Sequence, residues 1–263
     1  RNGILIEYKP FALGVRIEHR QGLIDSIQYK KEERGPFLPA SAYSLVAQVK
    51  YKGEERGAFS FCMCPGGFIV PAATSPGEIV VNGMSPSRRN SRYANSGMVV
   101  AIQEGDLKAY EAFGPLKGLQ FQKEIEQKAW ELAGQSQQAP AQRMVDFVEG
   151  KISNQLLECS YQPGLQSVDM QGILPPFIAQ SLKVAFKVFG KKLRGYLTNE
   201  AQILGVESRT SAPVRIPRDR ETYEHVNCKR LFPCGEGAGF AGGIMSAAMD
   251  GERCAEKVKA QYG

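Results

Sequence analysis

The hydrophobic period changes twice along this chain, and that change constrains the fold more than any other sequence feature. Up to about residue 110, the apolar residues form short β-branched or aromatic runs, which are typical of strands. Glycine and proline pairs such as Pro76-Gly77 separate the runs as turns. The runs cover residues 15–18, 43–49, 58–64, 67–72, 78–82 and 97–102. We expect a strand-rich domain over residues 1–112, built as a mixed or mostly antiparallel sheet or a partial barrel.

The middle of the chain has the period of helices. A first helix is predicted from Pro115, because Phe121, Ile125, Ala129 and Leu132 recur on one face. Two further helices are predicted, and their apolar faces recur at the same spacing. They begin near Pro140 and near Pro176. We expect residues 113–192 to form a helical subdomain apart from the strand-rich part.

After Leu193 the pattern returns to strand and loop, and it ends in an apolar strand, a glycine-rich turn and a long helix. The fold class expected is therefore α+β. The order of strands, then helices, then a strand-turn-helix is typical of domains inserted into a larger fold. We expect residues 193–263 to be the segment that returns to that larger fold, whose other part lies outside this chain.

The glycine-rich turn carries the clearest chemical signal. Its run RLFPCGEGAGFAGG (230–243) has five glycines within nine positions, an acidic residue, and a helix directly after it. The free N–H groups and positive dipole end of such a helix favour an anionic or electron-rich ligand. The alternative is a tight strand–helix junction in which the glycines serve packing alone. The turn is not a G-x-G-x-x-G fingerprint, because too little chain follows for a second strand and its acidic residue.

Composition excludes several classes of protein. The formal charge of +6, from 33 basic and 27 acidic residues, gives only a mild attraction to polyanions, so we expect no nucleic-acid partner. Six scattered cysteines and two histidines form no cluster with metal-ligand spacing. Neither a signal peptide nor an apolar run of membrane-spanning length is present, which predicts a cytoplasmic protein with no membrane contact.

Several segments resemble a known family, the FAD-dependent dehydrogenases called NAD(FAD)-utilising dehydrogenases, within the two-domain flavoproteins. The matching segments are KPFALGVRIEH (9–19), FCMCPGG (61–67), VNGMS (81–85), Ala94-Asn95-Ser96, LPPF (174–177), GVESRTSAPVRIPRD (205–219) and PCGEGAGFAGGIMSAAMDG (233–251). Together they extend over nearly the whole chain.

By that resemblance, the glycine-rich turn is the second FAD-binding segment of the family, in a Rossmann-like domain. Glu236 would accept hydrogen bonds from the ribityl hydroxyls, and the helix start would direct N–H groups toward the pyrimidine edge of the flavin. The residues implied in FAD binding are Gly235, Glu236, Gly237, Ala238, Gly239, Gly242, Gly243 and Ile244. The reductant would be NADH or NADPH. Residues 1–112 would then belong to the substrate side, which binds a small molecule.

The first FAD segment of the family, the G-x-G-x-x-G loop that holds the pyrophosphate, has no counterpart here. We therefore expect the chain to be a C-terminal portion whose partner is the N-terminal FAD-binding half of the same protein. Alone, the chain is expected to hold no stoichiometric FAD and to be inactive.

The catalytic residues are left open, with three weaker candidates. Arg209 lies just before the flavin turn and could stabilise reduced flavin or a substrate anion, or it could form a salt bridge with Glu207. Cys64, with Cys62, could exchange electrons with a flavin, although alternating strand geometry would place both thiols on one side as structural groups. His19 follows a predicted strand and could protonate a substrate, or it could be a satisfied core histidine.

Three functions are consistent with these features. The first is a flavin-dependent oxidoreductase to which this chain contributes one FAD-contacting loop and the substrate-side inserts. The second is a non-catalytic binding or scaffold module that keeps the flavoprotein fold. The third is an RNA-modifying flavoprotein, which predicts salt-sensitive RNA binding.

Overall fold

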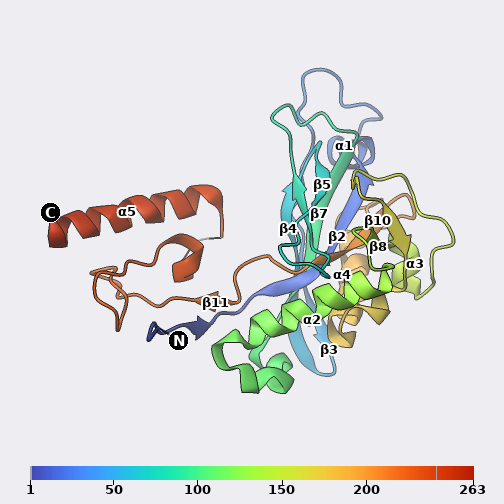
Figure 1. The fold of residues 1–263 in the computed structure, drawn as a ribbon. Coiled ribbons are helices and arrows are strands. Elements are labelled where there is room, and N and C mark those ends of the chain that lie inside the picture. Colours follow the sequence, from blue (N-terminus) through green and yellow to red (C-terminus); the bar gives the residue numbers. More distant parts are fainter. Residues whose placement is uncertain (1, 241) are drawn as a thin grey trace. The chain divides into compact units, whose positions relative to one another are not determined.

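The computed structural model describes residues 2–240 and 242–263, and it divides into two compact units (Figure 1). Unit 1 consists of Arg1–Phe11, Ile102–Gln122 and Arg209–Gly263. Unit 2 consists of Ala12–Ala101 and Lys123–Ser208. The chain therefore passes from unit 1 to unit 2 and back twice.

A seven-stranded sheet forms the centre of unit 2, with the strand order β3-β4-β7-β2-β10-β8-β9. Its strands are β2 (Ala12–Arg20), β3 (Val46–Tyr51), β4 (Glu54–Cys64), β7 (Tyr93–Ala101), β8 (Ala139–Arg143), β9 (Leu165–Ser167) and β10 (Gln202–Glu207). Neighbouring strands are antiparallel except β8 and β9, which are parallel. The sheet is mixed, and β3 and β9 are its edges.

The burial of each strand agrees with its position in the sheet. The central strand β2 is buried along eight of its nine residues, and β7 and β10 are similarly enclosed. Both faces of such a strand are covered: Leu13, Val15 and Ile17 lie on one face of β2, and the buried Ala12 and Arg16 lie on the other. The edge strand β3 alternates exposed and buried residues instead, as a strand with one solvated face does.

Helices cover this sheet. The long helix α4 (Pro176–Lys192) packs against β2, β3, β4 and β7 and buries Ile178, Leu182 and Phe186. It begins with proline in its first turn, where the missing N–H costs no hydrogen bond. Three other helical segments lie in unit 2, and β5 and β6 form a separate antiparallel pair. These elements are α1 (Gln21–Tyr29), α3 (Met144–Glu149), the 3₁₀ helix η2 (Met170–Gly172), β5 (Phe68–Pro71) and β6 (Val81–Met84).

Unit 1 contains short elements and one long helix. Strands β1 (Glu7–Tyr8) and β11 (Val214–Arg215) pair antiparallel. The others are the 3₁₀ helices η1 (Glu104–Leu116) and η3 (Gly235–Ala238) and the helix α5 (Ile244–Tyr262). The helix α2 (Lys117–Leu132) begins in unit 1 and ends in unit 2.

The structure confirms an α+β architecture but differs from the expected division of the chain. Residues 113–192 hold three helices, yet they also contribute β8 and β9 to the same sheet as β2. The helix expected from Pro140 is wrong over its first part, because Ala139–Arg143 pairs with β10 and the helix begins only at Met144. The seven-stranded sheet is mixed, which agrees with the expected mixed sheet. Whether these parts act as substrate-side and flavin-side domains of a larger protein stays a prediction.

The apolar strand expected before the glycine-rich turn does not form. Its carbonyl groups bond to side chains rather than to a neighbouring strand: Pro233 O accepts from Arg218 at 2.8 Å, and Phe232 O accepts from the Cys254 thiol at 3.6 Å. Pro233 itself has no N–H to donate. Among the described helices, none combines the length and the apolar character needed to cross a membrane.

Candidate functional site

Two glycines of the turn are required by the backbone. Gly235 has a φ of 59° at the start of η3, and Gly239 has a φ of 81° just after it. Side chains with a Cβ rarely adopt this left-handed conformation. The Gly239 N–H donates to the Glu236 carbonyl at 2.9 Å, which closes the 3₁₀ turn.

The other three glycines of the turn lie in open space. Gly237, Gly242 and Gly243 are exposed, and Gly237 and Gly243 lie outside the left-handed region. A Cβ on Gly237 or Gly242 meets no described atom within 4 Å, and one on Gly243 reaches only Ser246 Oγ at 3.5 Å. Packing within unit 1 therefore does not account for glycine at these positions. The turn presents bare backbone on its open side, as a loop that a ligand approaches closely must do.

The helix α5, which follows the turn, has large apolar side chains exposed at its start. Ile244 is 91% exposed and Met245 is 73% exposed at the first turn of α5. Of all the α5 residues, only Asp250 and Cys254 are buried. Exposed apolar groups of this size on one helix indicate a surface that something else covers.

A buried ion pair holds the turn in place. Arg218 donates from both terminal nitrogens to the Asp250 carboxylate, at 2.9 and 2.7 Å. The same carboxylate accepts from the Gly235 N–H at 2.7 Å, so α5 is tied to the first glycine of η3. The Arg218 guanidinium lies 3.9 Å from the Tyr223 ring centroid and 4.3 Å from that of Phe240. Arg218 lowers the pKa of Asp250 through these hydrogen bonds.

A pocket of about 450 Å³ opens beside this ion pair, within unit 1. Besides Arg218 and Asp250, it is lined by Arg220 and Arg253, the rings of Tyr223 and Phe240, and Ser246 and Met249 of α5. Guanidinium groups next to aromatic faces suit an anionic ligand that carries a planar group.

The other two residues predicted in the turn differ in burial: Ala238 is buried and Glu236 is exposed. Ala238 is 2% exposed and packs inside the turn. The exposed Glu236 carboxylate accepts the Ala212 N–H at 2.6 Å. The Glu236 carboxylate is therefore oriented by the backbone at Ala212.

Unit 2 contains a second charged cluster, which is fully enclosed. Arg16, from the middle of β2, donates from Nε to Glu207 at 2.7 Å and from Nη1 to Asn95 Oδ1 at 2.7 Å. Gly83 lies against the guanidinium, and a Cβ there would collide with both Arg16 and Asn95. The glycine of the VNGMS run is thus needed for the arginine to fit.

The two neighbouring cysteines do not lie as strand alternation predicts. Cys62 is exposed and Cys64 is 5% exposed. A β-bulge between Phe61 and Cys64 shifts the register of β4 against β7, and Cys62 has a φ of 46° at this bulge. The expectation that both thiols face one side as buried groups is wrong for this reason.

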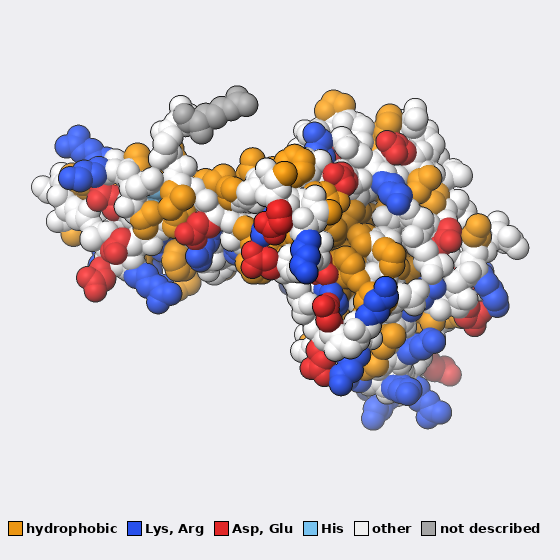
Figure 2. Space-filling view, turned by 90° about the horizontal axis from the view of Figure 1, so that it is seen from below, with side chains coloured by type: hydrophobic (Ala, Val, Ile, Leu, Met, Phe, Trp, Pro, Cys, Tyr) orange, Lys and Arg blue, Asp and Glu red, His pale blue; other side chains and the backbone are white. Residues whose placement is uncertain are grey.

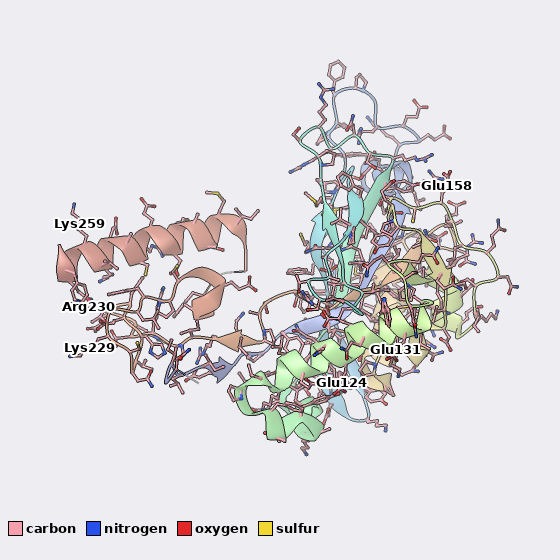
Figure 3. The ribbon with its side chains drawn as sticks, in the orientation of Figure 1. Glu124, Glu131, Glu158, Lys229, Arg230 and Lys259 are labelled. Carbon is pink, nitrogen blue, oxygen red and sulfur yellow. The ribbon has the colours of Figure 1, made fainter. Side chains whose placement is uncertain are left out.

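His19 lines a pocket of about 490 Å³ at one end of the sheet in unit 2. Its Nε2 bonds to the Tyr196 carbonyl at 2.9 Å, and burial lowers its pKa to about 4, so the ring is neutral at pH 7. Glu18, beside it, accepts hydrogen bonds from the Ser160 N–H and hydroxyl, and burial raises its pKa to about 7. Glu158, labelled in Figure 3, also lines this pocket and pairs with Arg20 at 3.4 Å.

Arg209 and Thr210 follow β10 in a half-buried segment that opens the last part of unit 1. Glu207, which the sequence offered as a salt-bridge partner for Arg209, forms an ion pair with Arg16. In the part of the chain that the structure describes, no three His, Cys, Asp or Glu side chains gather as metal ligands do. Acidic and basic side chains are interspersed over the face seen in Figure 2.

Sequence reasoning missed the residues that organise both clusters. Arg16 and Glu207 are 191 positions apart, and Arg218 and Asp250 are 32 apart. All four fall inside the segments that carry the family resemblance. A charged residue inside an apolar strand such as β2 was the one available signal, because burial of a lone charge is too costly to occur without a partner.

Comparisons with known proteins identify the family of this chain. Residues 10–210 match the family described as FAD-dependent protein, C-terminal domain-like. The matched range includes the Arg16 cluster and ends before the glycine-rich turn. An uncharacterized protein of Clostridium beijerinckii (strain ATCC 51743 / NCIMB 8052) is 42% identical over 260 residues, which is 98% of this chain and 48% of that protein.

The chain thus spans about half the length of the curated relative it matches. The family match covers most of the chain, from the start of the seven-stranded sheet to the end of β10. The chain therefore belongs to the FAD-dependent protein family that this C-terminal domain defines.

Proposed function

We propose that this chain is the C-terminal portion of a flavin-dependent oxidoreductase and that its glycine-rich turn contacts the flavin. The observation that carries the proposal is the open space at Gly237, Gly242 and Gly243, where packing does not account for glycine. A cradle of bare backbone before a helix N-terminus fits an electron-rich ring that approaches within contact distance. FAD, when bound, accepts and passes on electron pairs as hydride equivalents.

The residues of the turn have distinct roles in this proposal. The Glu236 carboxylate accepts hydrogen bonds from polyol hydroxyls, since the Ala212 N–H already orients it. The Gly243 N–H already donates to Ser246 Oγ at 3.3 Å, so the Ile244 N–H at the start of α5 is the group that would stabilise negative charge developing on reduction. The Arg218–Asp250 pair positions the turn and does not touch the reacting atoms.

The partner in this proposal is the N-terminal half of the same protein. The matched relative is about twice as long as this chain, and the apolar groups of α5 are uncovered here. That half would cover α5 and supply the pyrophosphate-binding loop. Unit 2 would then be the substrate side, and NADH or NADPH the reductant.

The experiment compares the full-length protein with this chain alone. Purified full-length protein is expected to carry about one FAD per chain, bleached anaerobically by NADH or NADPH, while this chain alone carries little. A tightly bound flavin that neither nucleotide nor dithionite reduces would indicate a scaffold module instead. Equimolar FAD on this chain alone would contradict the assigned division of the cofactor site.

A further inference from the structure

The strongest feature outside the flavin turn is the bulge of β4 in unit 2. In a regular strand, residues i and i+2 lie about 6.8 Å apart with parallel side chains. The Cβ atoms of a disulfide lie about 3.8 Å apart, so two such cysteines cannot join. The register shift between Phe61 and Cys64, with a left-handed Cys62, means that this regular spacing does not hold at the two cysteines.

The bulge gives the two thiols different environments but keeps them together. Cys62 is exposed, whereas Cys64 is 5% exposed. The Cys64 thiol donates to the Cys62 carbonyl at 3.3 Å, so the Cys64 sulfur lies against the backbone of Cys62. One sulfur is therefore accessible to a reagent, and the other lies behind it.

A fixed positive charge adjoins both cysteines. Arg16 Nη1 lies 3.4 Å from the Cys62 carbonyl oxygen and 3.9 Å from Cys64 Sγ. The guanidinium cannot turn away, because Glu207 and Asn95 hold it at 2.7 Å each. The guanidinium touches the sulfur of Cys64 but only the backbone of Cys62, and it stays protonated, so it attracts a nearby thiolate through space.

Charge and hydrogen bonding act on the two thiols in opposite directions. The Cys64 thiol, as hydrogen-bond donor, lowers the pKa of Cys62 to about 6, and Arg16 contributes to the decrease. The same interaction and burial raise the pKa of Cys64 well above its usual range. Cys62 therefore has the properties of an attacking thiolate, and Cys64 has those of the second thiol that attacks the mixed disulfide.

We propose that Cys62 and Cys64 form a redox-active dithiol that exchanges with small disulfides. The Cys62 thiolate attacks one sulfur of the small disulfide, whose S–S bond breaks, and one thiolate leaves and is protonated. Cys64 then loses its proton and attacks Cys62, the Cys62–Cys64 bond forms, and the second thiolate leaves with that proton. The protein loses two electrons, and the small disulfide becomes two thiols.

Oxidised glutathione is a suitable probe, and peptide mapping of the 263-residue chain is the readout. The wild type is expected to end with an intramolecular Cys62–Cys64 disulfide and no retained glutathione. Cys64→Ser should instead retain one glutathione, on Cys62. Cys62→Ser should form no adduct at Cys64, because that thiol is buried. Cys234→Ser is the matched control for an exposed cysteine elsewhere and should behave as the wild type at positions 62 and 64.

Alkylation kinetics give a second measurement. The iodoacetamide rate at Cys62 is expected to follow a titration with a midpoint near pH 6, and Cys64→Ala should move the midpoint upward. A wild-type chain that accumulates glutathione on Cys62 while Cys64 stays reduced would overturn the proposal. So would a Cys62 midpoint that Cys64→Ala leaves in place. Neither result depends on flavin, so the proposal and the proposed function can fail separately.

Discussion

Arg16 Nε donates to Glu207 Oε2 at 2.7 Å between the central strands β2 and β10, and the two side chains are 0% and 2% exposed. Asn95 Oδ1, on β7, accepts from the same guanidinium. Three adjacent strands of the sheet thus meet at one charged group. Burial of a charge without its partner is strongly unfavourable, so this pair fixes how the three strands align.

Loss of one partner of this pair should be costly. Arg16→Met leaves Glu207 buried without a cation and is expected to lower the free energy of unfolding by about 3–5 kcal/mol. Urea denaturation, followed by circular dichroism, measures it.

The exposed pair between Lys50 and Glu55 is the matched control, because its side chains are 73% and 63% exposed. Lys50→Met should change the free energy of unfolding by less than about 1 kcal/mol. The double variant Arg16→Met with Glu207→Leu should cost less than the sum of the single changes, since no charge is left alone. Equal effects at Arg16 and Lys50 would contradict the assignment of a buried pair.

Neighbouring residues Glu18 and His19 should give opposite pH dependences of stability. Burial raises the pKa of Glu18 to about 7, so its stabilisation is complete below the unfolded-state value of about 4.5 and is lost as pH rises through 7. Burial lowers the pKa of His19 to about 4, so the folded state is destabilised as pH falls from about 6.5 to 4. Each effect is worth about 3 kcal/mol over its window, and in the wild type they oppose each other between about pH 4.5 and 6.5.

Single substitutions should separate the two slopes. In Glu18→Gln, the free energy of unfolding should rise from pH 4 to 6.5 and then level, because only the His19 effect remains. In His19→Gln, it should fall between about pH 4.5 and 7. Urea denaturation at a series of pH values measures both. Slopes of the same sign in the two variants would show that burial does not perturb these groups as described.

The sheet could be predicted from sequence where its strands are β-branched or aromatic, as in β2, β4 and β7. Strands β8 and β9 could not, because Ala139–Arg143 contains no such residue and Leu165–Ser167 is only three residues long. Their pairing is decided by β10, which lies far along the chain. Helix propensity near Pro140 was overridden by that tertiary contact.

The candidate site was predictable only in its local part. The five glycines before the helix can be recognised from the sequence, and the structure shows that Gly235 and Gly239 have left-handed backbone conformations. The Arg218–Asp250 pair and the β4 bulge depend on three-dimensional proximity and on one left-handed residue, Cys62. A period-2 pattern carries no signal for a single inserted residue.

Gly243→Val should separate folding from flavin binding. A side chain at this position contacts only Ser246 Oγ at 3.5 Å, so the free energy of unfolding of this chain should change by less than about 1 kcal/mol. In the full-length protein, the same change should block the approach of the flavin and lower the FAD content.

Gly105→Val is the matched control, because its site in unit 1 is equally open and lies in η1. FAD occupancy of the purified variants, read from the visible spectrum, distinguishes them. Full occupancy in Gly243→Val would contradict the assignment of the turn.

Glu236→Gln should retain FAD but change its reduction potential. Glutamine keeps a carbonyl oxygen that can accept the Ala212 N–H, which Glu236 now accepts at 2.6 Å, so the turn should keep its shape. The substitution removes a negative charge, and a negative charge near the flavin opposes the anion that forms on reduction. The potential is therefore expected to rise, by about 20 mV for an interaction of about 1 kcal/mol in a two-electron couple. Anaerobic titration of the full-length protein against a reference dye measures it. Glu224→Gln, on an exposed carboxylate of the same unit, should leave the potential unchanged. A fall in potential for Glu236→Gln, or an equal rise for both variants, would show that the Glu236 charge does not act on the flavin.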